Sequence, residues 1–295
     1  MREAERDDLG RGALSMVASA LLFAGMGAAV KAASLELPNA AVVFFRNAFG
    51  LLALLPWLLR AEAPALHTRH LPEHLLRGLG GLASMYCFFY AISRLGLADA
   101  VLLNYSLPLF LPVIERVWLK EPLPAGLGRP LTVGFLGVLL ILRPGLGLFR
   151  PVALVGLLAA LFGALAQVGV RRLTRTEPVT RIVFYFGLIA TLVSALPLPW
   201  QWRTPRPATW GVLLATGVLA TAGQLFLTRA YSLAPAGRVG PFIFTGVVFA
   251  GTLDWALWGI LPNAFSVAGA VLVAAAAILA LRLREAPLTR SGHAL

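Results

Sequence analysis

Three ionisable side chains stand inside otherwise apolar stretches of the sequence, where each could do chemistry that water-exposed residues cannot. Arg46 lies in the middle of residues 38–56, and its guanidinium could bind an anionic group or hold helices together by bonding backbone carbonyls or a carboxylate. Glu115 and Asp254 lie near the ends of two other apolar stretches. A carboxyl group deprived of water can exchange protons near neutral pH, so both are candidates for proton coupling; contact with a polar boundary is the alternative.

Isolated polar side chains and prolines form a second group of candidates. Asn104 and Tyr105 precede Pro108, and a proline bends a helix because its ring nitrogen has no hydrogen to donate. Gln167 and Gln224 are lone amides in apolar stretches. A buried amide must find a partner, which could be a bound solute or a neighbouring helix.

Other reactive patterns are weak or absent from the sequence. His67, His70 and His74 recur near helical spacing beside Glu73 and could bind a metal, but Pro72 interrupts this stretch and a polar loop is the better interpretation. The sequence contains no nucleophile triad, phosphate-binding glycine loop or metalloprotease pattern. We therefore predict that the protein is not an enzyme and uses no metal and no cofactor.

The composition indicates that lipid surrounds these residues. Hydrophobic residues make up 59% of the 295 residues, charged residues 13%, and the mean hydropathy is +0.81. Soluble domains are about 45–50% apolar and about 25% charged, so the bilayer is expected to be the solvent of this chain. The net charge of +12 comes from basic residues in short loops, a pattern of membrane orientation that excludes nucleic acid as the expected partner.

Ten apolar segments are long enough, or nearly so, to cross the bilayer as helices. The expected segments are Ala13–Ala33, Ala40–Leu59, Leu75–Ile92, Leu97–Leu119, Leu127–Leu142, Val152–Val170, Val179–Leu196, Thr209–Tyr231, Pro235–Trp258 and Ala264–Leu283. The predicted fold class is an all-α polytopic membrane protein with ten transmembrane helices.

The segments repeat along the chain at an offset of 139 to 140 residues. Lys31 matches Arg171, and Glu115 matches Asp254. A repeat of five helices is odd, so the second copy must be inverted relative to the first, which is typical of secondary transporters. We predict repeats at residues 1–145 and 146–295; a duplicated membrane enzyme or scaffold is the alternative.

The distribution of basic residues predicts the orientation. With the N-terminus inside, eighteen lysines and arginines fall on the cytoplasmic side and six on the other. The excess of positive charge marks the cytoplasmic side, so both termini are expected to be cytoplasmic.

Several segments match a known family. They are FFRNAFGLLALLP, FFYAISRLGLADAVLLNYSLPLFLPVIERVWLKEPL and GFLGVLLILRPG. With them the chain resembles the EamA-type branch of the drug/metabolite transporter superfamily over nearly its whole length. Each repeat of that family typically carries an arginine in its second helix and a glutamate after its fourth, and Arg46 and Glu121 match them. The second half departs from the pattern, with Phe186 and Leu261 at or near the corresponding positions.

The resemblance implies a ten-helix protein of the bacterial cytoplasmic (inner) membrane. It also implies that the first, third, fourth, sixth, eighth and ninth segments line a central cavity. We expect that cavity to be mostly apolar and to bind neutral or zwitterionic organic molecules near mid-membrane. The substrate-binding candidates are Tyr86, Tyr90, Asn104, Tyr105, Gln167, Gln224, Phe244 and Thr245.

The predicted function is secondary transport of a small organic metabolite, amino-acid-like or otherwise neutral or zwitterionic. Export by alternating access is the expected direction and mechanism, with protons as the candidate coupling ion through Glu115 or Asp254. The alternatives are a passive facilitator without ion coupling, and a polytopic membrane enzyme or scaffold. The sequence predicts neither the substrate nor the oligomeric state.

Overall fold

Helices make up every regular element in the part of the chain that the structure describes. The computed structural model describes residues 9–58, 66–114, 117, 126, 128–142, 151–173, 176–233, 240–261 and 263–284. The prediction of an all-helical protein is confirmed for these residues.

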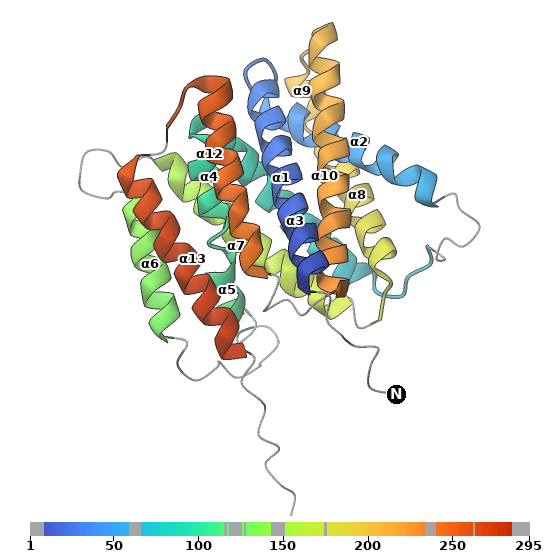
Figure 1. Ribbon diagram of the computed structural model, residues 1–295. Coiled ribbons are helices and arrows are strands. Elements are labelled where there is room, and N and C mark those ends of the chain that lie inside the picture. The colour runs from blue at the N-terminus through green and yellow to red at the C-terminus, as the bar shows by residue number, and fades with distance from the viewer. Residues whose placement is uncertain are drawn as a thin grey trace, which may run out of the picture.

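The helices pack side by side as a bundle (Figure 1). The first half contains α1 (Leu9–Ala33), α2 (Asn39–Leu58), α3 (Leu71–Arg94), α4 (Leu97–Asn104), α5 (Leu107–Ile114) and α6 (Gly128–Leu142). The second half contains α7 (Pro151–Leu173), α8 (Val179–Ala195), α9 (Leu198–Gln201), α10 (Pro207–Leu233), the 3₁₀ helix η2 (Gly240–Phe244), α12 (Thr245–Trp258) and α13 (Ala264–Arg284).

Among the described residues, four helices are long and apolar enough to cross a membrane. They are α1, α3, α7 and α10, and the apolar parts of α1 and α3 are 24 residues each. A helix of that length spans about 36 Å, enough for the roughly 30 Å of hydrocarbon in a bilayer. Helices α2, α8, α12 and α13 carry shorter apolar stretches.

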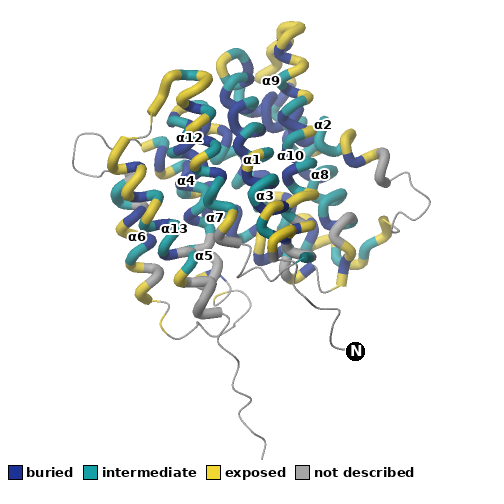
Figure 2. The backbone as a smooth tube through the Cα atoms, in the orientation of Figure 1, coloured by how far each residue is buried: buried dark blue, intermediate teal, exposed yellow. Residues whose placement is uncertain are grey.

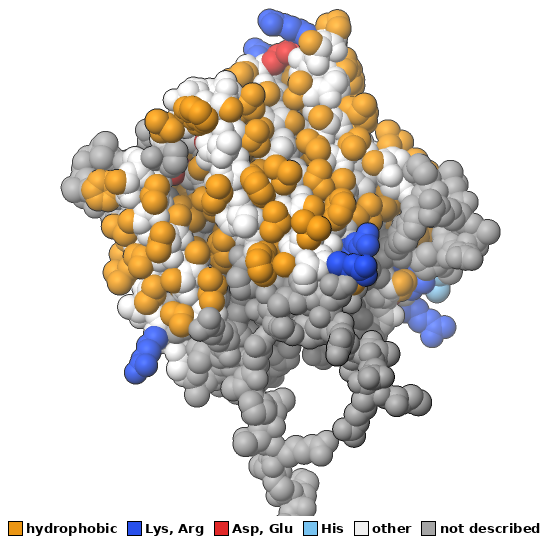
Figure 3. All heavy atoms as spheres, in the orientation of Figure 1, with side chains coloured by type: hydrophobic (Ala, Val, Ile, Leu, Met, Phe, Trp, Pro, Cys, Tyr) orange, Lys and Arg blue, Asp and Glu red, His pale blue; other side chains and the backbone are white. Residues whose placement is uncertain are grey.

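The outside of the bundle is as apolar as its inside. Leu14, Leu192 and Val248 are more than half exposed, although each is a large apolar side chain. Figure 3 shows such side chains spread over the face of the molecule, with blue lysine and arginine side chains towards its ends. Exposing this apolar surface to water would cost free energy, whereas exposing it to lipid tails does not. The protein is therefore an integral membrane protein.

Two predicted segments are broken rather than continuous. The fourth, expected at Leu97–Leu119, ends its first helix at Asn104 and resumes at Leu107. Pro108 explains the break, since it has no N–H to donate to the carbonyl of Asn104. The described part of the ninth segment starts with the 3₁₀ turn η2, which contains Pro241, and becomes α-helical at Thr245.

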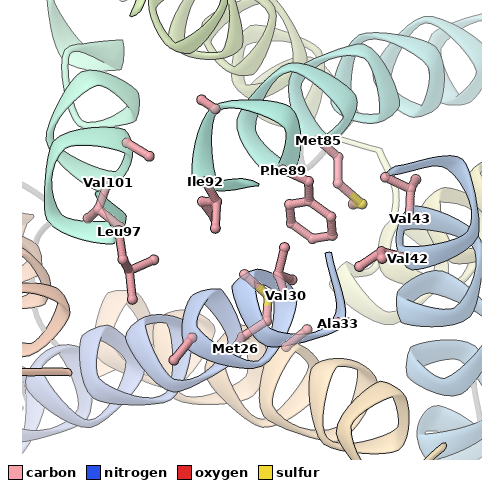
Figure 4. Packing of buried hydrophobic residues seen from close by; sticks show 14 of the residues in the cluster. Met26, Val30, Ala33, Val42, Val43, Met85, Phe89, Ile92, Leu97 and Val101 are labelled. Atoms are coloured by element: carbon pink, nitrogen blue, oxygen red, sulfur yellow. The ribbon is translucent and has the colours of Figure 1, made fainter. Parts of the chain in front are cut away.

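The buried core lies where α1, α2, α3 and α4 meet (Figure 4). Val30 of α1, Val42 of α2 and Phe89 of α3 point towards one another there, and all three side chains are fully buried. Figure 2 shows buried residues concentrated in the interior helices and exposed residues on the outer faces. Helix α10 packs beside α1, and α13 packs beside α6.

Gly217 allows α10 to lie directly against α2. A Cβ atom on Gly217 would lie 2.5 Å from the Cβ atom of Phe49 and 2.7 Å from the backbone nitrogen of Gly50. We expect Gly217→Val to force these helices apart and lower the free energy of unfolding by about 1–3 kcal/mol, the usual cost of overpacking. Gly211→Val is the matched control on the same helix, because a Cβ atom there would meet nothing within 4 Å. Equal thermal unfolding temperatures for the two variants would contradict the prediction.

Candidate functional site

A buried ion pair joins three helices at the end of the bundle where α1 and α12 finish. The ammonium of Lys31 donates to Oδ1 of Asp254 at 2.5 Å, and the backbone N–H of Ala98 donates to Oδ2 at 3.0 Å. Asp254 is 1% exposed and Lys31 8%. The same ammonium lies 4.4 Å from the centre of the Trp258 ring, a cation–π distance. Both oxygens of the carboxylate therefore have partners, which offsets the cost of removing it from water.

The start of α4 is built to receive this carboxylate. The N–H of Ala98 is one of the first four N–H groups of α4, which have no partner within the helix, and the positive end of the helix dipole favours an anion there. Gly96 caps the helix, and a Cβ atom on it would lie 3.2 Å from Oδ2 of Asp254. The aspartate thus ties α12 to both α1 and α4. Glu115, the second coupling candidate, lies outside the described residues, as does Glu121.

Arg46 is buried in α2 and is incompletely hydrogen-bonded. It is 9% exposed, and its Nη1 donates to Oδ1 of the neighbouring Asn47 at 2.9 Å. The Nε atom of Arg46 is buried without a hydrogen-bond partner. The Asn47 amide in turn donates to the carbonyl of Val43 and to the sulfur of Met85 in α3. Among the described residues, no carboxylate is paired with Arg46.

A second arginine, Arg77, lies within α3 and was not among the predicted site residues. The sequence analysis counts it among the cytoplasmic basic residues, because it stands only two residues after Leu75, where the third apolar segment is expected to begin; α3 in fact begins at Leu71. The guanidinium carbon of Arg77 lies 4.2 Å from the centre of the Phe186 ring in α8, and its Nε is buried without a partner. Phe186 occupies the position in the second half that corresponds to Arg46.

Two of the predicted substrate-binding residues meet where the broken segments touch. Tyr105 follows α4 at its break, and its ring packs edge-on against Phe244 at the end of η2, with 5.8 Å between the ring centres. A Cβ atom on Gly246 would also meet the Tyr105 ring, so the glycine makes room for it. The hydroxyl of Thr245 donates to the carbonyl of Phe242 within η2.

The remaining candidates are distributed over four helices. Tyr86 and Tyr90 lie on α3, where Tyr86 is partly buried and Tyr90 is exposed with its ring near Arg94. Gln167 is exposed on α7, and Asn104 and Gln224 are partly buried on α4 and α10. The convergence of all eight residues on one central pocket stays a prediction.

An apolar groove lies beside the broken segments, between α4, α12 and α13. Its cavity volume is about 540 Å³, and Phe244, Leu102 and Val267 are among its lining residues. Val248 and Val271, which also line it, are more than 60% exposed, so the groove opens to the outside of the bundle. In a membrane this is a lipid-facing groove.

A polar cluster connects α3 and α8 at the end of the bundle where α3 starts. Glu177 accepts hydrogen bonds from Thr68, at 2.6 Å, and from Arg181. Burial raises the pKa of the Glu177 carboxyl, but the two hydrogen bonds and the nearby charges of Arg181 and His74 together lower it more, so its pKa lies below the usual value. The buried ring of His74 stacks on Tyr185 with 4.6 Å between ring centres. Within the described residues, no three His, Cys, Asp or Glu side chains lie close enough together to hold a metal ion.

Buried charges, broken helices and an apolar outer surface are the features of a protein that moves polar solutes through a membrane. The chain belongs to the EamA-like transporter family, whose model matches residues 10–143 and 150–282. This confirms the resemblance to EamA-type drug/metabolite transporters.

Transporters of known substrate are similar over most of the chain. A pseudopaline exporter of Pseudomonas aeruginosa, CntI, is 40% identical over 95% of this chain and 99% of its own length. A riboflavin transporter of Brucella anthropi is 29% identical over 87% of this chain and 95% of its own length. An S-adenosylmethionine uptake transporter of Rickettsia prowazekii is 27% identical over 79% of each chain. The names of the family and of these relatives indicate transport of small molecules.

A solved crystal structure has the same fold. It superposes with a TM-score of 0.65 at 20% sequence identity and covers 94% of this chain and 99% of the other. At this identity the match supports the arrangement of helices and says nothing about the substrate.

Proposed function

We propose that this protein is a secondary transporter that exports a small organic metabolite across the bacterial inner membrane by alternating access. The observation that carries the proposal is the 40% identity to a pseudopaline exporter along nearly the full length of both chains. Pseudopaline, or an amino-acid-like zwitterion handled in the same way, is the first candidate substrate. Both termini lie in the cytoplasm in this proposal, as the excess of basic residues on that side indicates.

Ten membrane helices in two inverted repeats are part of the same proposal, and the helix contacts support it. Helix α1 packs on α10, and their counterparts in the other half, α7 and α3, pack on each other. Helix α10 packs on α2 at Gly217, and α3 packs on α8 at Gly78, the residue that corresponds to Gly217. Equivalent contacts are expected if residues 1–145 and 146–295 are two copies of one unit joined about a pseudo-two-fold axis.

Asp254 offers a route for proton coupling in this scheme. Protonation would discharge the carboxylate that holds Lys31 and would weaken the tie between α1, α4 and α12. Proton binding would then favour separation of these helices, and by reciprocal linkage their separation would favour proton binding. Glu115, the counterpart of Asp254 in the first half, lies outside the described residues and is the second candidate for the same role.

Flux through purified protein in liposomes tests the function. We expect uptake of pseudopaline into liposomes holding inside-out protein, above that of riboflavin and S-adenosylmethionine, and faster with a pH gradient than without. If the rate of flux does not depend on any ion gradient, the protein is a passive facilitator. Absence of flux for all three solutes and for a panel of amino acids would overturn the transport proposal in favour of a membrane enzyme or scaffold.

A further inference from the structure

Two arginines lie at the junction of α2, α3 and α8, and neither has a counter-charge among the described residues. Arg46 and Arg77 each have a buried Nε atom that lacks a hydrogen-bond partner. Of the described ion pairs, none includes either residue. Asn47, which accepts a hydrogen bond from Arg46, donates to Met85 of α3, the helix that carries Arg77, so both arginines border the contact between α2 and α3.

The local geometry directs both side chains towards one place. Arg77, Gly81 and Met85 succeed one another at four-residue intervals and so share a face of α3. Met85 at one end of this face is bonded by the amide of Asn47, which itself accepts from Arg46. At the other end Arg77 lies over the Phe186 ring. A Cβ atom on Gly81 would lie 2.8 Å from that ring, so the glycine keeps the middle of the face open to the two side chains.

Such an arrangement is costly in the ligand-free protein. A buried charge without a partner loses its hydration and gains nothing in return, and a second charge of the same sign adds repulsion. Asn47 supplies one neutral acceptor for Arg46, and the Phe186 ring supplies a weak cation–π contact for Arg77. Neither contact neutralises a positive charge, and the described residues supply no carboxylate, so an anion would complete the junction.

We propose that Arg46 and Arg77 bind the carboxylate of the transported solute. The planar fork of a guanidinium matches the two oxygens of a carboxylate, and the contact with the Phe186 ring helps to position the Arg77 guanidinium. The proposal rests on the transport function and narrows its substrate to organic acids, amino-acid zwitterions included. A lipid phosphate offers the same charge, but Arg46 is the eighth residue of the twenty in α2 and 9% exposed, away from the helix ends where headgroups lie.

Matched acids and amides test the site by binding alone. Purified protein in nanodiscs of phosphatidylcholine would be heated with phenylalanine, histidine or glutamine, and with the carboxamide of each. We expect at least one acid to raise the unfolding temperature of the wild type at a concentration at least tenfold below that of its amide. Arg46→Gln and Arg77→Gln should each abolish this difference between the acid and its amide, because loss of one partner of a buried charge pair weakens binding by at least about tenfold.

The control keeps the fold and changes an arginine outside the junction. Arg94→Gln removes a charge from the exposed end of α3, where Arg94 lies near the Tyr90 ring, and should preserve the difference. If no acid stabilises the wild type at a lower concentration than its amide does, the assignment is wrong. It is also wrong if this difference between acid and amide persists in either arginine variant. Arginine-dependent stabilisation by added phosphatidylglycerol, with none by any acid, would identify a lipid site instead.

Flux measured on the same preparation separates this proposal from the transport function. If the protein moves solutes but shows no preference for acids over amides, the proposed carboxylate site is wrong and the proposed transport function stands. If the protein shows the arginine-dependent preference for acids but moves no solute, the carboxylate site stands and the proposed transport function is wrong.

Discussion

Asp254→Asn should lower the free energy of unfolding by about 3–5 kcal/mol, because it leaves a buried ammonium without its counter-charge. Lys31 is 8% exposed and has the Asp254 carboxylate as its ionic partner, so it cannot recover hydration without moving α1. Asparagine keeps an oxygen that can accept from the N–H of Ala98, so the variant removes the charge and preserves the shape. The thermal unfolding temperature of purified protein measures the effect.

A double variant shows whether the charge pair is the cause. Lys31→Met with Asp254→Asn removes both charges and should recover most of the stability lost by Asp254→Asn alone. The exchanged pair, Lys31→Asp with Asp254→Lys, should stay unstable, since an ammonium cannot accept the hydrogen bond from Ala98. A double variant no more stable than Asp254→Asn would show that something other than the unpaired charge is responsible.

The same substitution has an expected effect on transport. If protons act through Asp254 or Glu115, then Asp254→Asn and Glu115→Gln should abolish flux driven by a pH gradient and leave solute exchange intact. Full gradient-driven flux in the double replacement would remove both carboxyl groups from the coupling mechanism.

The sequence predicted the helical class and most helix positions because apolar length is a local property. Hydropathy found α1, α3, α7 and α10 to within a few residues, since a helix in lipid must satisfy its own backbone and needs about 20 apolar residues to do so. It placed the start of α3 four residues late, at Leu75, because Glu73 and His74 interrupt the apolar run. The helix in fact begins at Leu71 with Pro72 in its first turn, where a missing N–H has no cost.

The sequence alone does not predict which side chains contact one another inside the bundle. Asp254 was found because a carboxylate in an apolar segment is rare, but its partners come from α1 and from the start of α4, more than 150 residues away. Lys31 could have been noticed from its match with Arg171 in the repeat. Arg77 was missed because the burial of its Nε atom depends on α8 packing against it at Phe186, which no local pattern records.

Arg46→Gln should leave the ligand-free protein as stable as the wild type, or up to about 4 kcal/mol more stable, while lowering solute flux at least tenfold. The reason is that the arginine charge has no counter-charge among the described residues and therefore opposes folding until a carboxylate binds. Glutamine retains an N–H donor that can replace the bond from Arg46 to Asn47. Residues that serve binding commonly cost stability in this way.

Arg46→Lys distinguishes charge from geometry. Lysine keeps the positive charge and the cost of burying it, so it should give no gain in stability, and it loses the planar fork that holds a carboxylate with two bonds. We therefore expect reduced flux with wild-type stability, measured as initial rate per folded molecule and as unfolding temperature. If Arg46→Gln instead destabilised the protein as strongly as Asp254→Asn, while flux per folded molecule stayed normal, Arg46 would be a helix-packing residue and the junction of α2, α3 and α8 would have no part in binding.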